Sequence, residues 1–353
     1  MTSHTYQQAA STGTIDGPLQ GHHREWYVVS PDGAKGGVSR LKVGQPREDV
    51  LWFDRRSFTS EEELLLRLHG LVPRVPPVQR VGSPGPVILD FIEGDPLNRL
   101  SSAGSSVTPA VVDQIMEVFS ALGQVLPGTV LQWQISTRTD GLKDSAQFLQ
   151  SLIRFTREEV YEQREPEFGE LFRRLGIRGR AVAPDSHLVH EAAGLTARPF
   201  CLLHGDLHRA NFIVDNENRL WTIDWELATL GDPLYDLATH LHLMRYPDDQ
   251  RRKVTERWKT TMEKVLPGAS AGLADDLPRY LAYKRTQSVY TDVMRHAIKI
   301  RKCAAPEERE KQLDESAEAV GSVLADAGEC LGVSSVPGTT EIKDAYRAYC
   351  PTS

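Results

Sequence analysis

The sequence predicts an α+β fold of two lobes, a small β-rich amino-terminal lobe and a larger, mainly helical carboxy-terminal lobe. Strand-like segments with alternating apolar residues are concentrated before Gly94. After Gly94, apolar residues recur at helical spacing over long stretches, such as 111–126 and 277–300. The chain has 353 residues, which is enough for two lobes that share one cleft.

We place the amino-terminal lobe at residues 18–93 and the carboxy-terminal lobe at residues 94–333. Residues 1–17 are polar and lack the apolar core of a secretion signal. We expect this segment to be partly disordered. Residues 334–353 are expected to form a peripheral tail.

Composition indicates a soluble globular protein. Apolar residues make up 40% of the chain and charged residues 25%. No stretch approaches the roughly 20 apolar residues of a membrane span. The four cysteines are scattered and form no Cys-x-x-Cys pair, which fits a reducing cytoplasm. The net charge of −7 argues against a nucleic-acid-binding protein. We therefore expect a cytoplasmic protein with neither a membrane nor a nucleic acid as partner.

Two neighbouring strands are predicted near the amino terminus. The segment Arg24-Glu-Trp-Tyr-Val-Val29 is typical of a strand, and Ser30-Pro-Asp-Gly33 is typical of a turn. Gly37-Val-Ser-Arg-Leu-Lys-Val43 alternates as a half-buried strand does. Lys42 lies in this second strand, and an edge-strand lysine that faces water is the alternative interpretation.

A helix is predicted to begin after Thr59-Ser60. Ser or Thr followed by glutamate is a capping pattern, and the acids Glu61, Glu62 and Glu63 suit the first helical turn. The leucines that follow supply an apolar stripe. Some of these glutamates therefore need do nothing but stabilise the helix.

The segment with the most chemical information is His204-Gly-Asp-Leu-His-Arg-Ala-Asn211, followed thirteen residues later by Asp224. Phosphoryl transfer needs one carboxylate that orients an acceptor hydroxyl. It also needs an amide and a second carboxylate to hold the magnesium that bridges the nucleotide phosphates. Asp206, Asn211 and Asp224 can fill these roles in that order.

The spacing between Asn211 and Asp224 has a structural reason. Residues 212–214 and 220–223 are apolar and strand-like, and residues 215–218 are typical of a turn. Two short strands joined in this way form an antiparallel hairpin, which returns the chain to its starting point. Asn211 and Asp224 should then supply half of a magnesium site, with phosphates and water as the remaining ligands.

Other interpretations of this segment remain open. His204, Asp206 and His208 alternate and might ligate a transition metal, although no third His or Cys cluster follows at metal spacing. Asp206 alone might cap a turn. A relative that has lost catalysis would also retain the pattern.

The segment 204–211 is similar to the catalytic loop of the aminoglycoside phosphotransferase family, which shares the protein-kinase-like fold. The Asp-to-Asn spacing of five matches the protein-kinase pattern. Gly205 stands where that pattern has an arginine, as it does in antibiotic and small-metabolite kinases. Gly231-Asp-Pro-Leu-Tyr-Asp-Leu-Ala238 also resembles a run in this family.

The resemblance implies Mg²⁺ as cofactor and ATP or GTP as phosphoryl donor. It assigns Asp206 to the acceptor hydroxyl, and we expect His208 to steady the transferring phosphoryl group. Asp236 is expected to brace the catalytic loop from below. Lys42 is expected to contact the α- and β-phosphates, with Glu61 as its carboxylate partner and Glu62 as second choice.

The resemblance also places the nucleotide. We expect the phosphate-covering turn at Gly21, His22 and His23, although no G-x-G-x-x-G pattern occurs there. The segment 86–94 resembles the hinge strand, so adenine would bond to the carbonyl of Asp90 and the N–H of Ile92. Backbone contacts leave no side-chain signature, and adenine and guanine cannot be distinguished here.

The acceptor site is predicted from acidic residues. Glu226, Asp232 and Asp292 are the candidates, together with the acids 248–249, although a charge run of that kind is more often solvated surface. The predicted function is O-phosphorylation of an antibiotic, either an aminoglycoside or a nucleoside or peptide type. Alternatives are a kinase for a sugar, choline or homoserine-like metabolite, and a non-catalytic nucleotide-binding module. A protein kinase is disfavoured because D-F-G and A-P-E are missing at the expected places.

Overall fold

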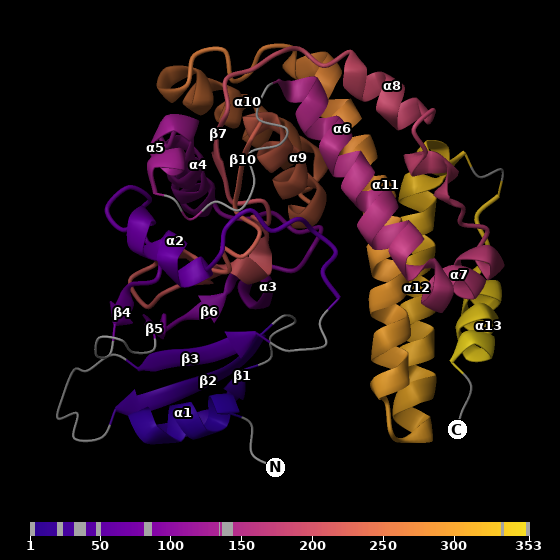
Figure 1. Cartoon of the computed structure of the whole chain (residues 1–353), viewed down its shortest axis with the longest axis horizontal. Coiled ribbons are helices and arrows are strands. Elements are labelled where there is room, and N and C mark those ends of the chain that lie inside the picture. Colours follow the sequence, from indigo (N-terminus) through magenta and orange to yellow (C-terminus); the bar gives the residue numbers. More distant parts are fainter. Residues whose placement is uncertain are drawn as a thin grey trace. The chain divides into compact units, whose positions relative to one another are not determined.

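The computed structural model has the predicted α+β architecture, with a small antiparallel sheet towards the amino terminus and a larger helical part after it (Figure 1). It describes residues 4–19, 24–31, 40–46, 51–80, 87–133, 135, 144–332 and 335–350. The chain divides into two compact units. The first unit consists of residues 1–52, 56–139 and 199–270, and the second of residues 53–55, 140–198 and 271–353.

A five-stranded antiparallel sheet with the order β1-β2-β3-β5-β4 opens the first unit. Because side chains alternate along a strand, each strand serves two faces. Tyr27, Val29, Val43 and Ile88 pack together on one face, against Ala9 of the first helix. The strands are β1 (Gly13–Leu19), β2 (Arg24–Pro31), β3 (Leu41–Pro46), β4 (Val78–Arg80) and β5 (Val87–Asp90).

The opposite face of the sheet carries cations and an aromatic ring. Trp26 of β2 lies directly across from Gly44 of β3, and Val28 lies across from Lys42. A Cβ atom on Gly44 would meet Cε3 of Trp26 at 2.0 Å, so the indole covers this glycine. Arg24 shares the face because it precedes Trp26 by two positions.

The amino-terminal segment differs from the partial disorder that we expected for residues 1–17. Residues 4–19 form α1 (His4–Thr12) and β1. Strand β1 pairs with β2 from Gly13 opposite Pro31 to Leu19 opposite Trp26. Helix α1 covers the apolar face of the sheet, where Ala9 is fully buried. The polar composition of this segment hid the few apolar contacts that order it.

Helix α2 (Glu61–Leu68) begins as the sequence predicted. Ser60 is its N-cap and accepts a hydrogen bond from the backbone N–H of Glu63 at 3.2 Å. The helix buries Leu64, Leu65 and Leu68, and also Glu61. Of the three glutamates in the first turn, Glu61 is the one that the helix buries.

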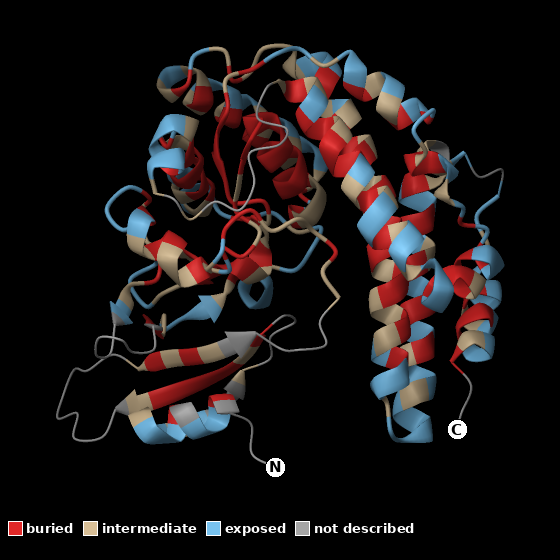
Figure 2. Cartoon of the chain, viewed as in Figure 1, coloured by how far each residue is buried: buried red, intermediate tan, exposed pale blue. Residues whose placement is uncertain are grey.

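The remainder of the first unit combines short strands and helices. Strand β6 pairs with β8 and β8 with β9, while β7 pairs with β10. Helix α4 packs against α10, and α9 is almost wholly buried (Figure 2). The elements are β6 (Asp95–Pro96), α3 (Leu97–Leu100), α4 (Pro109–Gln124), α5 (Pro127–Gln132), β7 (Cys201–Leu203), β8 (Phe212–Val214), β9 (Leu220–Thr222), β10 (Thr229–Gly231), α9 (Pro233–Met244) and α10 (Asp248–Val265).

The second unit is helical. Helix α6 (Ser145–Phe155) continues into a π-helical turn (Thr156–Tyr161), and α11 packs along α12. The other helices are α7 (Glu165–Arg174), α8 (His187–Ala193), α11 (Leu273–Lys302), α12 (Pro306–Leu331) and α13 (Thr339–Tyr349). No helix in the described part of the chain combines the length and the apolar character that a membrane crossing requires.

The carboxy-terminal segment also differs from expectation, since we predicted a peripheral tail at 334–353. Helix α13 packs against α12 and α7 and buries Ile342 and Tyr346 completely. The hydroxyl of Tyr346 donates to the carbonyl of Val293 at 3.0 Å. The partners of α13 lie far back in the chain, so its local sequence did not reveal them.

The two compact units do not follow the lobe boundaries that we placed at 18–93 and 94–333. Residues 53–55 and 140–198 cluster with the carboxy-terminal helices rather than with their neighbours in the chain. The lobe boundaries therefore stay a prediction.

A buried ion pair joins two segments of the second unit. Nη1 of Arg198 lies 2.6 Å from Oδ2 of Asp276, and both side chains are at most 1% exposed. The same Asp276 carboxylate accepts the backbone N–H of Thr196 at 2.9 Å. A second cation, Arg279, donates to Oδ1 at 3.0 Å. The carboxylate is thus matched by three donors, as a buried charge must be.

We expect Asp276→Asn to lower the free energy of unfolding by about 3–5 kcal/mol, because it leaves the Arg198 charge buried without a counter-charge. Urea denaturation measures this loss. The neighbouring exposed acid provides a matched control, since Asp275→Asn should cost less than about 1 kcal/mol. Equal losses in the two variants would show that burial of the ion pair is unimportant.

Candidate active site

The predicted hairpin after Asn211 is confirmed. Strands β8 and β9 pair antiparallel, with Phe212 opposite Thr222 and Val214 opposite Leu220. Next to the pair of Phe212 and Thr222, at the open end of the hairpin, the N–H of Ile223 donates to the carbonyl of Asn211 at 2.9 Å. The hairpin therefore returns the chain to Asn211 one residue before Asp224.

Asp236 braces the catalytic loop, as predicted. The carboxylate belongs to the first turn of α9 and is 1% exposed. Its oxygens accept the backbone N–H groups of His204 at 3.0 Å and of Gly205 at 2.8 Å. Two charge-assisted hydrogen bonds to successive amides fix the backbone just before Asp206.

Gly205 has a backbone conformation that other residues rarely adopt. Its φ is +82°, and a Cβ atom would lie 2.5 Å from the carbonyl oxygen of Leu227. Both the left-handed conformation and the close approach favour glycine. The glycine in the motif is thus a requirement of the loop and not only a family signature.

Asp206 is joined to two of the other predicted residues. Nδ2 of Asn211 donates to the Asp206 carbonyl at 2.9 Å and to Oδ2 at 3.0 Å. Nε2 of His208 lies 3.3 Å from the same Oδ2. Nδ1 of His208 accepts the N–H of Ala210 at 3.1 Å, so we assign the ring proton to Nε2, facing the Asp206 carboxylate.

His204 has a structural role. Its Nε2 donates to the carbonyl of Ile223 at 3.2 Å, and its Nδ1 accepts the N–H of Asp206 at 3.3 Å. Burial lowers the pKa of His204 to about 4, so the ring is neutral at pH 7. Both ring nitrogens are occupied, and the described ranges contain no group of three His, Cys, Asp or Glu side chains suited to a metal. This arrangement disfavours the transition-metal alternative.

Asp224 lies where acids crowd together. Its φ of +64° is unusual for a residue with a side chain. The residue as a whole is exposed, although many protein atoms lie near its carboxylate. Desolvation, followed by repulsion from Glu61, Asp206 and Glu226, raises its pKa to about 7. A divalent cation would relieve this repulsion, and carboxylate and amide oxygens suit Mg²⁺.

Lys42 lies on the same side as these acids. Its ammonium is 3.9 Å from the centroid of the Trp26 ring. Burial lowers the pKa of Lys42, while the acids Glu61, Asp224 and Glu226 oppose that shift. The lysine therefore lies with the four acids Glu61, Asp206, Asp224 and Glu226, here called the acid cluster, rather than at a solvent-facing edge.

Glu61 has two partners in addition to its electrostatic attraction to Lys42. Its Oε1 accepts the N–H of Trp225 at 3.0 Å, and its Oε2 accepts from Nη1 of Arg24 at 3.2 Å. Arg24 was missed by the sequence analysis. The only signal was its place two residues before Trp26 on the strand opposite Lys42, which does not by itself indicate a role.

A model of the phosphotransferase enzyme family matches residues 50–268, well over half of the chain. The chain belongs to this family. It is thus a phosphotransferase with an alcohol group as acceptor. No curated protein was similar enough in sequence to count as a match.

Solved structures show the same fold. The chain is similar to macrolide 2′-phosphotransferase MphH from Brachybacterium faecium, with a TM-score of 0.55, 15% identity, and coverage of 94% of this chain and 99% of that one. A thermostable aminoglycoside phosphotransferase mutant in complex with ADP and hygromycin B has a TM-score of 0.52, 14% identity, and coverage of 99% and 100%. For Plasmodium vivax ethanolamine kinase the TM-score is 0.51, the identity 12%, and the coverage 98% and 84%.

The three predicted acceptor residues of this phosphotransferase have different surroundings in the structure. Asp232 is fully buried and caps α9 by accepting the N–H of Leu234 at 2.9 Å, which favours a structural role. Glu226 is buried and lies 3.8 Å from Nε of Arg24, so it belongs to the acid cluster. Asp292 lies on α11 of the second unit and pairs with Arg295 at 3.0 Å.

The predicted nucleotide contacts are only partly described. Gly21, His22 and His23 lie outside the described residues. Asp90 ends β5, and its side chain accepts from Gln79 at 2.6 Å. Ile92 lies just beyond this strand. These assignments stay predictions for the phosphotransferase.

Arg209 and His240 hold the catalytic loop from other sides. Arg209 donates to the carbonyl of Met244 and to Ser101 and Ser105, and it is 4% exposed. His240 donates from Nδ1 to the carbonyl of Leu207 at 2.9 Å. Sequence reasoning missed both because their partners lie in other segments.

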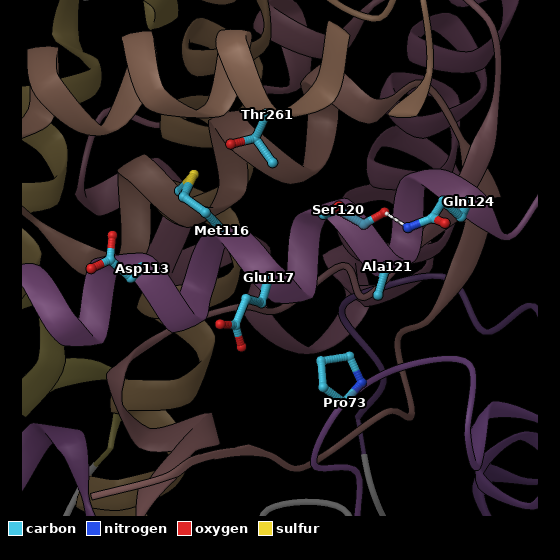
Figure 3. A pocket seen from close by; sticks show the side chains of 8 residues that line it. All are labelled: Pro73, Asp113, Met116, Glu117, Ser120, Ala121, Gln124 and Thr261. Atoms are coloured by element: carbon cyan, nitrogen blue, oxygen red, sulfur yellow. Dashed lines mark hydrogen bonds between the residues drawn. The ribbon is translucent and has the colours of Figure 1, made fainter. Parts of the chain in front are cut away.

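A hollow of about 510 Å³ on α4 lies apart from this chemistry (Figure 3). Its acids Asp113 and Glu117 pair with Arg257 and Arg74, and none of the predicted site residues line it. We therefore place the candidate site at the acid cluster rather than at this hollow.

We expect Gly205→Ala to destabilise the enzyme more than Gly70→Ala. Gly70 also has a positive φ, but a Cβ atom added there would have no atom within 4 Å, so it isolates the conformational strain of about 1–2 kcal/mol. Alanine at position 205 adds the collision with Leu227, for a further loss of about 1–3 kcal/mol. Thermal or urea unfolding measures the difference, and equal losses would contradict the proposed close approach.

We expect His240 to make the enzyme less stable in acid. Its pKa in the folded state is lowered to about 4 by burial, while the unfolded value is about 6.5. The unfolded state therefore binds more protons between these values, and stability falls as pH drops from about 6.5 to 4, by up to about 3 kcal/mol.

The variant His240→Gln retains hydrogen-bonding groups but cannot titrate. The wild-type advantage over this variant should therefore shrink as pH falls through that window. Urea unfolding at pH 7, 6, 5 and 4 measures it. Parallel pH curves for the two proteins would exclude the mechanism.

Proposed function

We propose that this phosphotransferase transfers the γ-phosphate of ATP or GTP to a hydroxyl of a small molecule, with an antibiotic as the first candidate acceptor. The observation that carries the proposal is the Asp206 carboxylate, tied to Asn211 and His208 and flanked by the acid cluster around Asp224. We further infer that the enzyme acts in the cytoplasm, where nucleoside triphosphates are available.

Each candidate catalytic residue has its own role in phosphoryl transfer. Asp206 orients the acceptor hydroxyl and accepts its proton. His208 presents its Nε2 proton to that carboxylate, and it can donate this proton to the transferring phosphoryl group only by leaving Asp206. Lys42 neutralises phosphate charge. Most of the acceleration then comes from alignment and charge neutralisation rather than from covalent chemistry.

Asn211 and Asp224 fit a magnesium ion. They supply one amide oxygen and one carboxylate, and Mg²⁺ usually takes only one or two protein carboxylates together with phosphates and water. Held by these two side chains, the ion would offset the negative charge of the nucleotide phosphates. Desolvation and then the nearby carboxylates Glu61, Asp206 and Glu226 raise the pKa of Asp224, and a cation held there would offset both.

The structural neighbours support a nucleotide donor. Two of them are aminoglycoside phosphotransferase mutants solved with ADP or AMP-PNP together with hygromycin B. Adenine nucleotides are therefore the first donors to test, and GTP is the second.

The structural neighbours act on acceptors of two classes, which are the first to test. The macrolide and aminoglycoside phosphotransferases favour an antibiotic, whether an aminoglycoside, a macrolide, or another hydroxylated type such as a nucleoside or a peptide. The ethanolamine kinase favours a small metabolite such as choline. Incubation of the enzyme with Mg·ATP and a compound library, followed by mass spectrometry for an added phosphate, separates the two. Antibiotic protection of bacteria that express the enzyme supports the first class.

We expect Asp206→Asn to reduce turnover about 10²–10⁴-fold, because the amide cannot accept the hydroxyl proton. The Kd for Mg·ADP should change less than about threefold, since Asp206 is not assigned to the nucleotide. Coupled nucleoside-diphosphate release and calorimetry measure the two quantities.

Asp248→Asn provides the control for this variant, because Asp248 is an exposed acid at the start of α10. It should match the wild type in both measurements. Equal losses of binding and turnover in Asp206→Asn would refute the assigned role.

A further inference from the structure

The carbonyl of Asp90, the last residue of β5, has no donor across from it in the sheet. Val78 of β4 lies opposite Leu89, which places Pro77 opposite Asp90. The N–H of Asp90 donates to the carbonyl of Pro77 at 2.9 Å, so the backbone of Asp90 faces β4 at this point. Two residues paired in this way normally exchange two hydrogen bonds. Proline has no N–H, so the return bond to the Asp90 carbonyl is missing and the ladder ends.

Two residues further on, the N–H of Ile92 is also unpaired among the described residues. Phe91, between them, turns its N–H the other way and donates to the carbonyl of Arg40 at 2.7 Å. Because the chain alternates between its two sides here, the Asp90 carbonyl and the Ile92 N–H face the same side. The main chain therefore presents an acceptor and a donor together, and such groups rarely stay without a partner away from water.

The residues on both sides of Ile92 are held in place. The guanidinium carbon of Arg40 lies 4.6 Å from the centroid of the Phe91 ring. The same guanidinium donates to both carboxylate oxygens of Glu93, at 2.6 and 2.5 Å. Gly94 follows, and a Cβ atom there would lie 2.3 Å from a carbonyl oxygen of β8. The donor and the acceptor thus belong to a segment with little freedom to lose when a ligand binds.

An acceptor followed by a donor matches one edge of adenine. Adenine offers an amino donor beside a ring nitrogen that accepts, whereas guanine offers a carbonyl acceptor beside a ring N–H. In the same position, the carbonyl of guanine would meet the carbonyl of Asp90, and two acceptors would face each other. Lys42, which we assign to the phosphates, lies opposite Leu89, the residue before Asp90. One pair of strands can therefore serve both the base and the phosphates.

We propose that Pro77 makes the enzyme select an adenine nucleotide over a guanine nucleotide. By withholding an N–H from the Asp90 carbonyl, Pro77 ends the β4–β5 ladder and leaves that acceptor open beside the Ile92 N–H. Pro77 touches no ligand and is a positioning residue that sets specificity. The inference rests on the proposed function, because it concerns the donor nucleotide of the same site.

A measurement on the nucleotide-free protein tests the open carbonyl by itself. Pro77→Ala supplies an N–H opposite Asp90 and should extend the ladder by one hydrogen bond. We expect the amide that this variant introduces to exchange its hydrogen at least about tenfold more slowly than an unprotected amide, as measured by NMR. Exchange at the unprotected rate would show that Pro77 does not determine the pairing of the carbonyl, and would overturn the proposal.

Nucleotide affinities test the consequence for specificity. The wild type should bind Mg·ADP at least about tenfold more tightly than Mg·IDP, whose base replaces the amino group by a carbonyl and carries a ring N–H. In Pro77→Ala, the Kd for Mg·ADP should rise about three- to tenfold, because the carbonyl already has a donor. The Kd for Mg·tripolyphosphate, which has no base, should stay within about twofold. Equal weakening of ADP and tripolyphosphate, or equal binding of ADP and IDP by the wild type, would refute the selection.

Pro73→Ala is the matched control. Pro73 belongs to the same segment before β4, but it lines the hollow on α4 and lies outside the β4–β5 pairing. This variant should keep the wild-type ratio of the ADP and IDP dissociation constants. If the wild type binds none of ADP, IDP and GDP, the proposed function fails, while the hydrogen-exchange measurement still decides whether Pro77 leaves the Asp90 carbonyl open.

Discussion

The crowding of desolvated carboxylates is the constraint on which the candidate active site of this phosphotransferase depends. Desolvation, with repulsion from Glu61, Asp206 and Glu226 added to it, raises the pKa of Asp224 to about 7. Such a cluster is stable only when cations and donors oppose it. The first unit supplies Arg24 and a lysine from the sheet together with backbone N–H groups, and a bound divalent ion would complete the balance.

The rigidity of the catalytic loop follows from the same requirement. Asp236 accepts two successive amides, Arg209 bonds to two distant segments, and His240 holds the carbonyl of Leu207. A loop held from several sides does not have to reorganise when charge develops during transfer. Gly205 is part of this design, since only its conformation lets the loop pass close to Leu227.

The local structure around the candidate catalytic residues was predictable because these residues lie close together in the sequence. The hairpin that brings residue 223 back to Asn211 is encoded by two short apolar runs and a polar turn, and its register is confirmed. The N-cap Ser60 and the bracing role of Asp236 were predicted for similar reasons. The helices of the two terminal segments were not predicted, because α1 and α13 pack against partners that their own composition does not indicate.

The sequence by itself determined the fold class, the family and the order of the acid, amide and acid along the chain, because these depend on short spacings and local periodicity. Only the tertiary structure decided which cation meets Glu61, that Asp232 is a cap, and that Glu226 joins the acid cluster. Arg24 and Glu226 are about two hundred residues apart in the sequence. Contacts of that range arise from packing of the whole first unit, so no local pattern specifies them.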